Sequence, residues 1–132
     1  MRLADLIDDD KPFWKQYHKR QCPGMAEVDF DGSRNKYVGL ALIRSEGDKT
    51  SERVVAVRIN VGGLESRTIY DDFKAPPYTV VFQVGPGITW EWDQPNKKIR
   101  IPHDSLVAAT IEAAAQQFYL KDGKFRYVQT SD

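Results

Sequence analysis

The stretch FYLKDGKFRYVQ, residues 118–129, does most to decide the fold expected for this chain. It places Asp122-Gly123 between two runs in which aromatic residues alternate with other types. An Asp-Gly pair suits a two-residue turn with positive φ at both positions, and such turns join antiparallel strands. The stretch therefore predicts a β-hairpin, and the chain is expected to end on a strand.

Further strand-like segments lie upstream, rich in β-branched and aromatic residues and separated by short turns. The gaps are too short for the crossover helices of a parallel sheet, so the spacing favours antiparallel pairing. Trp90 and Trp92 are expected to share one face of their strand, before a turn at Gln94-Pro95-Asn96. The segments are 25–30, 36–45, 52–60, 66–70, 79–84, 88–92 and 97–101.

Residues 12–21 have apolar residues at helical spacing, so they predict a short helix, with a helical turn before it. Pro12 suits the first turn of a helix, and Pro23-Gly24 is expected to end the helix. The fold class is therefore α+β, with a short N-terminal helix packed on a mostly antiparallel β meander. The meander is expected to form a sheet or a partly closed sandwich.

The stretch from Leu106 to Leu120, LVAATIEAAAQQFYL, is ambiguous. Its alanine and glutamine content favours a helix, whereas its β-branched and aromatic residues also suit strands. On propensity alone the helix is the stronger prediction.

Bulk composition restricts the class of protein. The 132 residues suit one domain, 1–132, and 19 basic residues balance 19 acidic ones, so no net charge favours nucleic acid or anionic lipid. No apolar run reaches the roughly 20 residues that span a bilayer. A single cysteine, Cys22, excludes an internal disulfide. Neither nucleic acid nor a membrane is expected as a partner.

The sequence DFDGSRNKY, residues 29–37, is the sharpest local motif. Oxygens of Asp29, Asp31 and Ser33 alternate along it, and this pattern could bind a calcium ion. Tyr37 stands where a carboxylate would be needed, and the alternative is a β-turn held by Asx hydrogen bonds. Calcium is the one cofactor that the sequence suggests.

No catalytic set is recognisable. His18 and His103 are far apart in sequence, neither has metal-ligand spacing, and neighbouring carboxylates read as solvated charges. We therefore expect a protein that is not an enzyme. Aromatic residues dominate protein-binding surfaces, although core packing also accounts for them. The candidate partner-binding residues are Tyr78, Trp90, Trp92 and Tyr119.

Several short motifs resemble small bacterial proteins with an FG-GAP or VCBS-like acidic loop. These motifs are Cys22-Pro23-Gly24, Asp29-Phe30-Asp31-Gly32, the apolar run 38–43, Asp122-Gly123-Lys124-Phe125-Arg126 and Thr130-Ser131-Asp132. The resemblance implies that residues 106–120 are extended, which overturns the prediction from propensity. It also implies that the acidic loop descends from a calcium site, although Ser33, Arg34 and Tyr37 depart from the pattern of the family.

Two functions are expected from these observations. The first is a non-catalytic bacterial protein-binding module, an inhibitor or immunity-type protein. The second is a calcium-binding or calcium-stabilised extracellular module. Relatives of the resembling family carry a secretory leader, so the chain is expected in the cytoplasm if Met1 is the native start, and in the periplasm or outside the cell if a leader was removed.

Overall fold

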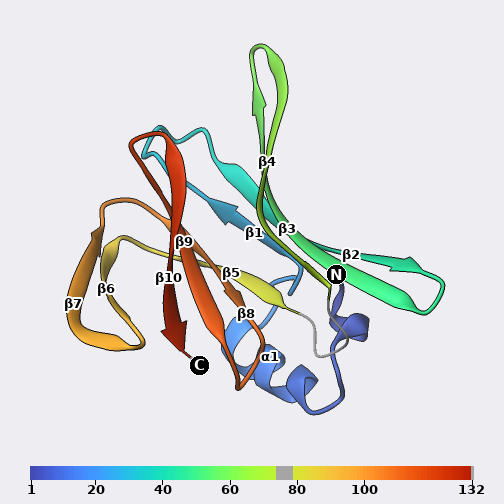
Figure 1. Cartoon of the computed structure of the whole chain (residues 1–132). Coiled ribbons are helices and arrows are strands. Elements are labelled where there is room, and N and C mark those ends of the chain that lie inside the picture. The colour runs from blue at the N-terminus through green and yellow to red at the C-terminus, as the bar shows by residue number, and fades with distance from the viewer. Residues whose placement is uncertain (74–78, 132) are drawn as a thin grey trace.

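A computed structural model describes residues 1–73 and 79–131 of the chain. Figure 1 shows two layers of antiparallel strands, a separate hairpin at one side and a helix at one end. The elements are η1 (Leu3–Asp5), α1 (Asp10–His18), β1 (Met25–Val28), β2 (Tyr37–Glu46), β3 (Lys49–Asn60), β4 (Gly63–Phe73), β5 (Val80–Val84), β6 (Gly87–Glu91), β7 (Gln94–Ile101), β8 (Ser105–Ala109), β9 (Ala115–Lys121) and β10 (Lys124–Ser131).

The strands form several sheets, so the prediction of a single meander is wrong. The first sheet is a true meander in the order β1-β2-β3-β4. The second has the order β10-β9-β8-β5, and β6 and β7 form a two-stranded sheet of their own. The coarser prediction, antiparallel strands with a short N-terminal helix, is confirmed, and every predicted strand overlaps an observed one.

The main core lies between the two four-stranded sheets. Alternation puts one set of side chains from each strand on the inner face of its sheet, as the pattern along β3 shows with Val54 and Ala56 fully buried. Phe118 and Leu106 face them from the second sheet. The cluster contains Val28, Phe30, Tyr37, Ala41, Val54, Ala56, Val81, Leu106, Ala108 and Phe118.

The helix packs against the outer side of β5, at one end of the second sheet. Trp14 of α1 is 1% exposed and belongs to a second buried cluster with Leu6, Val80 and Ile111. His18 stacks on Trp14 at 4.1 Å and contacts the ring of Phe82 at 4.7 Å. The predicted helix is thus confirmed with shifted bounds, since it begins at Asp10 and ends at His18, before the predicted stop at Pro23.

The two layers are tied together at their edges, which makes the sandwich partly closed. On one side the amide of Val81 in β5 donates to Pro23 O at 2.8 Å, just before β1. On the other side Arg67 of β4 donates to Gly123 O at 3.1 Å and its guanidinium lies over the Phe125 ring.

The Asp-Gly hairpin is confirmed. Asp122 and Gly123 have φ values of 52° and 70°, and Lys121 pairs directly with Lys124. Both positive φ values are those that a tight two-residue hairpin turn requires.

Residues 106–109 and 115–120 are extended, as the resemblance implied, and a turn over 110–114 joins them, so the helix predicted from propensity is wrong. They form most of β8 and β9, which pair through Leu106–Phe118 and Ala109–Ala115. β8 also pairs with β5 over its whole length, so Ala108 and Ala109 lie in a strand with a hydrogen-bonded neighbour on each side. Pairing on both edges, with burial of Leu106 and Phe118, outweighs the local preference of alanine for helix.

The predicted turn at residues 94–96 is also wrong, because the chain turns at Trp92 and Asp93 and β7 begins at Gln94. Trp92 is therefore a turn residue and does not share a strand face with Trp90.

Candidate functional site

The β6–β7 hairpin presents an exposed apolar face. Ile88 pairs with Arg100 and Trp90 pairs with Lys98 across the two strands, so these four side chains lie on the same face. Ile88 is 55% exposed and Trp90 is 49% exposed, and Trp92 in the turn is 57% exposed. The opposite face is turned inward, since Ile101 is buried.

The hairpin is fixed to the second sheet rather than free to move as a loop. The amide of Trp92 donates to Gln129 O in β10 at 2.8 Å, which holds the turn against the last strand. Lys97 donates to Glu91 across the hairpin, and this hydrogen bond raises the pKa of Lys97 above its ordinary value. The exposed tryptophans are therefore held on a supported element.

Two adjoining hollows separate the hairpin from β9 and β10. They have volumes of about 470 and 460 Å³ and share Arg100, Tyr119 and Lys121 in their walls. We call their union the basic groove. Its further lining residues are Phe30, Asp31, Glu91, Lys97, Lys98, Ile99, Pro102, His103, Leu120, Asp122, Gly123 and Tyr127.

The charged side chains of the basic groove are mostly basic once those that form ion pairs are set aside. Glu91 is bonded to Lys97, and Asp31 is bonded to Arg58 outside the groove. Lys98, Arg100 and Lys121 remain as cations, and Asp122 is an acidic residue of the lining. The arrangement can hold an acidic group beside the ring of Tyr119.

The structure thus brings together three of the four residues predicted to bind a partner. Trp90 and Trp92 lie on the hairpin, and Tyr119 lines the groove beside it. Tyr78 lies outside the described residues.

The acidic loop predicted to bind calcium joins β1 to β2, and most of its oxygens accept hydrogen bonds from the chain itself. Asp31 accepts from the Ser33 amide at 3.0 Å, and Ser33 Oγ accepts from the Asn35 amide at 3.2 Å. Asp29 accepts from the Arg34 amide at 3.2 Å, while its Oδ1 is buried without a partner in the described part of the chain. These bonds are the Asx and Ser turns of the alternative interpretation.

Arg58 of β3 occupies the remaining oxygen of Asp31. Its Nη1 donates to Asp31 Oδ2 at 2.8 Å, its Nη2 donates to Glu65 at 3.0 Å, and its guanidinium lies over the Tyr37 ring at 4.3 Å. Burial acts to raise the pKa of Asp31, but hydrogen bonds from Ser33 and Arg58 outweigh it and hold that pKa below its ordinary value. A calcium ion at Asp31 would have to compete with this guanidinium.

No metal-binding cluster of three or more His, Cys, Asp or Glu side chains occurs within residues 1–73 and 79–131. The calcium site stays a prediction, with Asp29 Oδ1 as its one open buried oxygen.

The histidines and the cysteine are dispersed. His18, the last residue of α1, packs between the rings of Trp14 and Phe82. The ring of His103 lies against Gly32, so close that a Cβ added to this glycine would be 2.7 Å from it. His103 makes no hydrogen bond to Asp31 or Asp122, although all three line the same hollow. Cys22 Sγ donates to Met1 O at 3.5 Å.

Sequence reasoning missed Arg58, Arg100 and Lys121, because nothing in their local sequence shows which distant residues they meet. It also overlooked the exposed apolar residues Val61 and Leu64 at the turn from β3 to β4. The signal there was available, since a turn flanked by Ile59 and Leu64 with no charged residue between them is unusually apolar.

Neither helical segment in the described part of the chain has the length and apolar character needed to cross a membrane. Comparisons with protein-family models, with curated proteins and with solved structures give no match to this chain. The resemblance to FG-GAP or VCBS-like proteins therefore stays untested.

Proposed function

We propose that this protein is a non-catalytic protein-binding module, of the inhibitor or immunity type, whose partner contacts the outward face of the β6–β7 hairpin. The observation that carries the proposal is the exposure of two tryptophans, Trp90 and Trp92, about half of each, on one supported hairpin. Tryptophan is the residue most typical of binding hot spots, because it buries a large rigid area at a low cost in conformational entropy.

The surroundings of the two tryptophans have the composition of a binding surface. Ile88 adds an aliphatic side chain to this face. On the neighbouring strand, Arg100 lies opposite Ile88 and Lys98 lies opposite Trp90. An apolar centre with a charged rim is the usual arrangement at protein interfaces. The basic groove continues this surface toward Tyr119, so a partner segment leaving the tryptophans would meet cationic groups.

The first experiment compares wild type with a Trp90→Ala, Trp92→Ala double variant. Each protein is immobilised and exposed to a cell extract. Any protein that wild type retains is purified, and its affinity for wild type and for the double variant is measured by titration. Truncating a hot-spot residue costs about 2 kcal/mol or more, so affinity should fall at least about thirtyfold.

A matched control removes two exposed aromatic residues from another surface. Phe13 and Tyr17 lie on α1, are 37% and 62% exposed, and contact each other. The Phe13→Ala, Tyr17→Ala variant should keep the wild-type affinity. Equal binding by the tryptophan variant and by wild type, with both variants folded, would refute this hairpin as the binding surface.

A second readout uses fluorescence. The chain has three tryptophans, and Trp14 is 1% exposed, so an aqueous quencher should reach chiefly Trp90 and Trp92. Binding of the purified partner should protect these two from quenching. Unchanged quenching in a saturated complex would place the partner elsewhere.

A further inference from the structure

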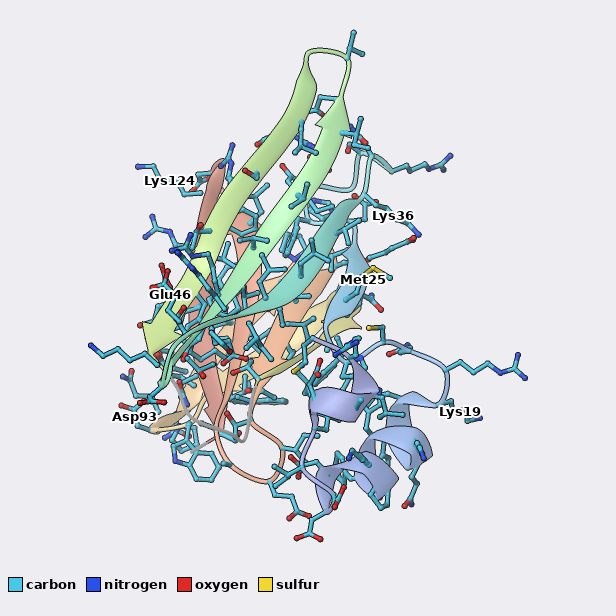
Figure 2. The ribbon with its side chains drawn as sticks, turned by 90° about the vertical axis from the view of Figure 1, so that its right-hand side faces the viewer. Lys19, Met25, Lys36, Glu46, Asp93 and Lys124 are labelled. Carbon is cyan, nitrogen blue, oxygen red and sulfur yellow. The ribbon has the colours of Figure 1, made fainter. Side chains whose placement is uncertain are left out.

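The outward face of the first sheet is apolar over its middle rows, although no described element of the chain covers it. The strand registers pair Val38 with Val57, Leu40 with Val55 and Leu40 with Met25. Directly paired residues share one face of a sheet, and none of these five belongs to a buried cluster or packs against one. Figure 2 views the molecule from this side and shows β2, β3 and β4 in front of the second sheet, with α1 to one side.

This apolar surface continues beyond the middle rows. Leu42 is 45% exposed, and Ile59 and Leu64, which pair across the β3–β4 hairpin, are 78% and 71% exposed. We call the whole surface the outer apolar face, and it consists of Met25, Val38, Leu40, Leu42, Val55, Val57, Ile59 and Leu64. Large contiguous apolar patches are rare on monomeric proteins and mark interaction sites.

The sequences of β2 and β3 have the pattern of strands that are covered on both faces. An antiparallel strand with one solvated face alternates between apolar and polar residues. Residues 37–43, YVGLALI, and residues 54–57, VVAV, show no such alternation. The inward residues of these runs, Ala41, Val54 and Ala56, fill the core between the two sheets. The outward residues have no matching layer in a single copy, so the pattern predicts a second layer.

The charged side chains around the outer apolar face mostly neutralise one another. The ion pairs are Arg53–Asp71, Lys36–Glu27 and Arg44–Glu46. Among the described outward residues of β1 to β4, Lys49 is the one charged residue without an oppositely charged partner, and it lies at the turn between β2 and β3, away from the middle rows. The chain as a whole has 19 basic and 19 acidic residues. A second copy that approaches this face therefore meets no like-charge repulsion across its middle rows.

The composition and size of the outer apolar face favour a second copy of the chain over a transient partner. Homodimer interfaces are more apolar than those of non-obligate complexes. Two copies also carry the same sheet twist, and sheets of equal twist pack face to face with their strands at about −30°. With the usual strand spacing and rise, the four strands project roughly 600 Å² per copy. Two copies would bury roughly 1,200 Å², which reaches the range of specific interfaces.

We infer that this protein forms a symmetric homodimer in which the outer apolar faces of two copies pack on each other, as the two sheets of a sandwich do. A two-fold axis uses the same patch on both subunits, which a uniform aliphatic face satisfies. Figure 1 shows the β6–β7 hairpin on the opposite side of the molecule from β2 and β3. The dimer therefore leaves Trp90 and Trp92 of both copies open, and it does not depend on the proposed protein-binding function.

Sedimentation equilibrium of the full chain over a wide concentration series measures the dimer. Wild type should reach the mass of two chains as the concentration rises. Val55→Lys places an unpaired charge from each copy in the centre of the interface, so the dissociation constant should rise at least about hundredfold. Ile7→Lys is the matched control, because Ile7 is a 41% exposed aliphatic residue outside the first sheet, and it should leave the dissociation constant unchanged.

A gentler variant separates loss of the dimer from loss of the fold. Val55→Thr, Val57→Thr keeps β-branched side chains on the strand and should raise the dissociation constant at least about tenfold. The Tm of wild type should rise with protein concentration, because the dimer forms only from folded chains. The Tm of this variant should match that of wild type at high dilution and should rise less with concentration.

Three results would overturn the homodimer. The first is a wild type that stays monomeric over the whole series. The second is a dimer that Val55→Lys leaves as tight as wild type, as pairing through the edge strand β4 would. The third is a monomeric wild type with a protein partner that Val55→Lys loses, which would assign the face to that partner. The Trp90→Ala, Trp92→Ala variant should dimerise like wild type, so failure of the proposed function and failure of the dimer are distinguishable.

Discussion

Gly39 in the first sheet lies directly against Leu106 in the second, so Gly39→Ala tests the packing of the two layers. A Cβ added to this buried glycine of β2 would lie 2.7 Å from both methyl carbons of Leu106 in β8 and 3.3 Å from its Cγ. Real Cβ contacts are longer than this, and Leu106 is fully buried with no room to turn away. The substitution must therefore move one sheet relative to the other or force Leu106 off its rotamer.

The expected loss follows from two opposing contributions. Overpacking a core by one methyl group costs about 1–3 kcal/mol. Replacing glycine by alanine also reduces the entropy of the unfolded chain, which returns about 0.4–1 kcal/mol. The net loss should be about 1–2 kcal/mol, which for a chain of this size corresponds to a fall in Tm of about 3–8 °C.

Urea and thermal unfolding of four proteins provide the assay: wild type, Gly39→Ala, Leu106→Val and the double variant. Shortening Leu106 removes the clash, so the loss caused by Gly39→Ala should shrink in the Leu106→Val background by about 1 kcal/mol of coupling. Gly85→Ala is the control, because a Cβ there meets nothing within 4 Å, and it should leave stability within about 0.5 kcal/mol of wild type. A neutral Gly39→Ala, or an equal loss in both backgrounds, would refute the packing between β2 and β8.

Three further predictions concern the turns and the Arg58 cluster. The Arg58→Met variant should have a lower Tm than wild type at pH 7, and the difference in Tm should shrink as the pH falls well below 4. The reason is that the hydrogen bond from Arg58 lowers the pKa of Glu65. The pKa of Asp31 is also lowered, although burial acts to raise it. Groups with lowered pKa stabilise the fold above their unfolded pKa of about 4, and this stabilisation is lost as they protonate. Thermal melts of both proteins from pH 7 to pH 3 measure the difference. Millimolar calcium should leave the Tm of wild type unchanged while Arg58 holds Asp31, and a rise that a chelator reverses would support the calcium site instead. Gly123→Ala should cost about 1 kcal/mol in urea unfolding because φ is 70° there, and an unchanged midpoint would contradict the turn geometry.

The local parts of the fold were accessible to sequence reasoning because they depend on neighbouring residues. Asp122-Gly123 requires positive φ in any hairpin, and alternation along 52–60 specifies a strand whatever it pairs with. Pro12 likewise marks the first turn of the helix, where a missing N–H costs nothing.

The candidate sites were accessible only in part. The aromatic types at 90, 92 and 119 indicated a binding surface, but exposure decides whether a tryptophan binds or packs, and exposure is a property of the folded surface. Trp14 shows the contrast, since it lies on α1 and is buried among Leu6, Val80 and Ile111, while Trp90 is half exposed. The oxygens of Asp29 and Asp31 had calcium-loop spacing, but the guanidinium that engages Asp31 comes from a residue 27 positions away.

The sequence by itself determined the strand segments, the terminal hairpin and the short helix, because backbone preferences and side-chain alternation act over a few residues. Only the tertiary structure decided which sheet each strand joins, that residues 106–109 and 115–120 are strands, and that Ile59, Val61 and Leu64 stand outside the core. Those outcomes depend on burial and hydrogen bonding between residues distant in sequence, such as β8 with β5 and Arg58 with Asp31. The free energies of these long-range interactions exceed the local preferences of the backbone, and no pattern of neighbouring residues indicates them.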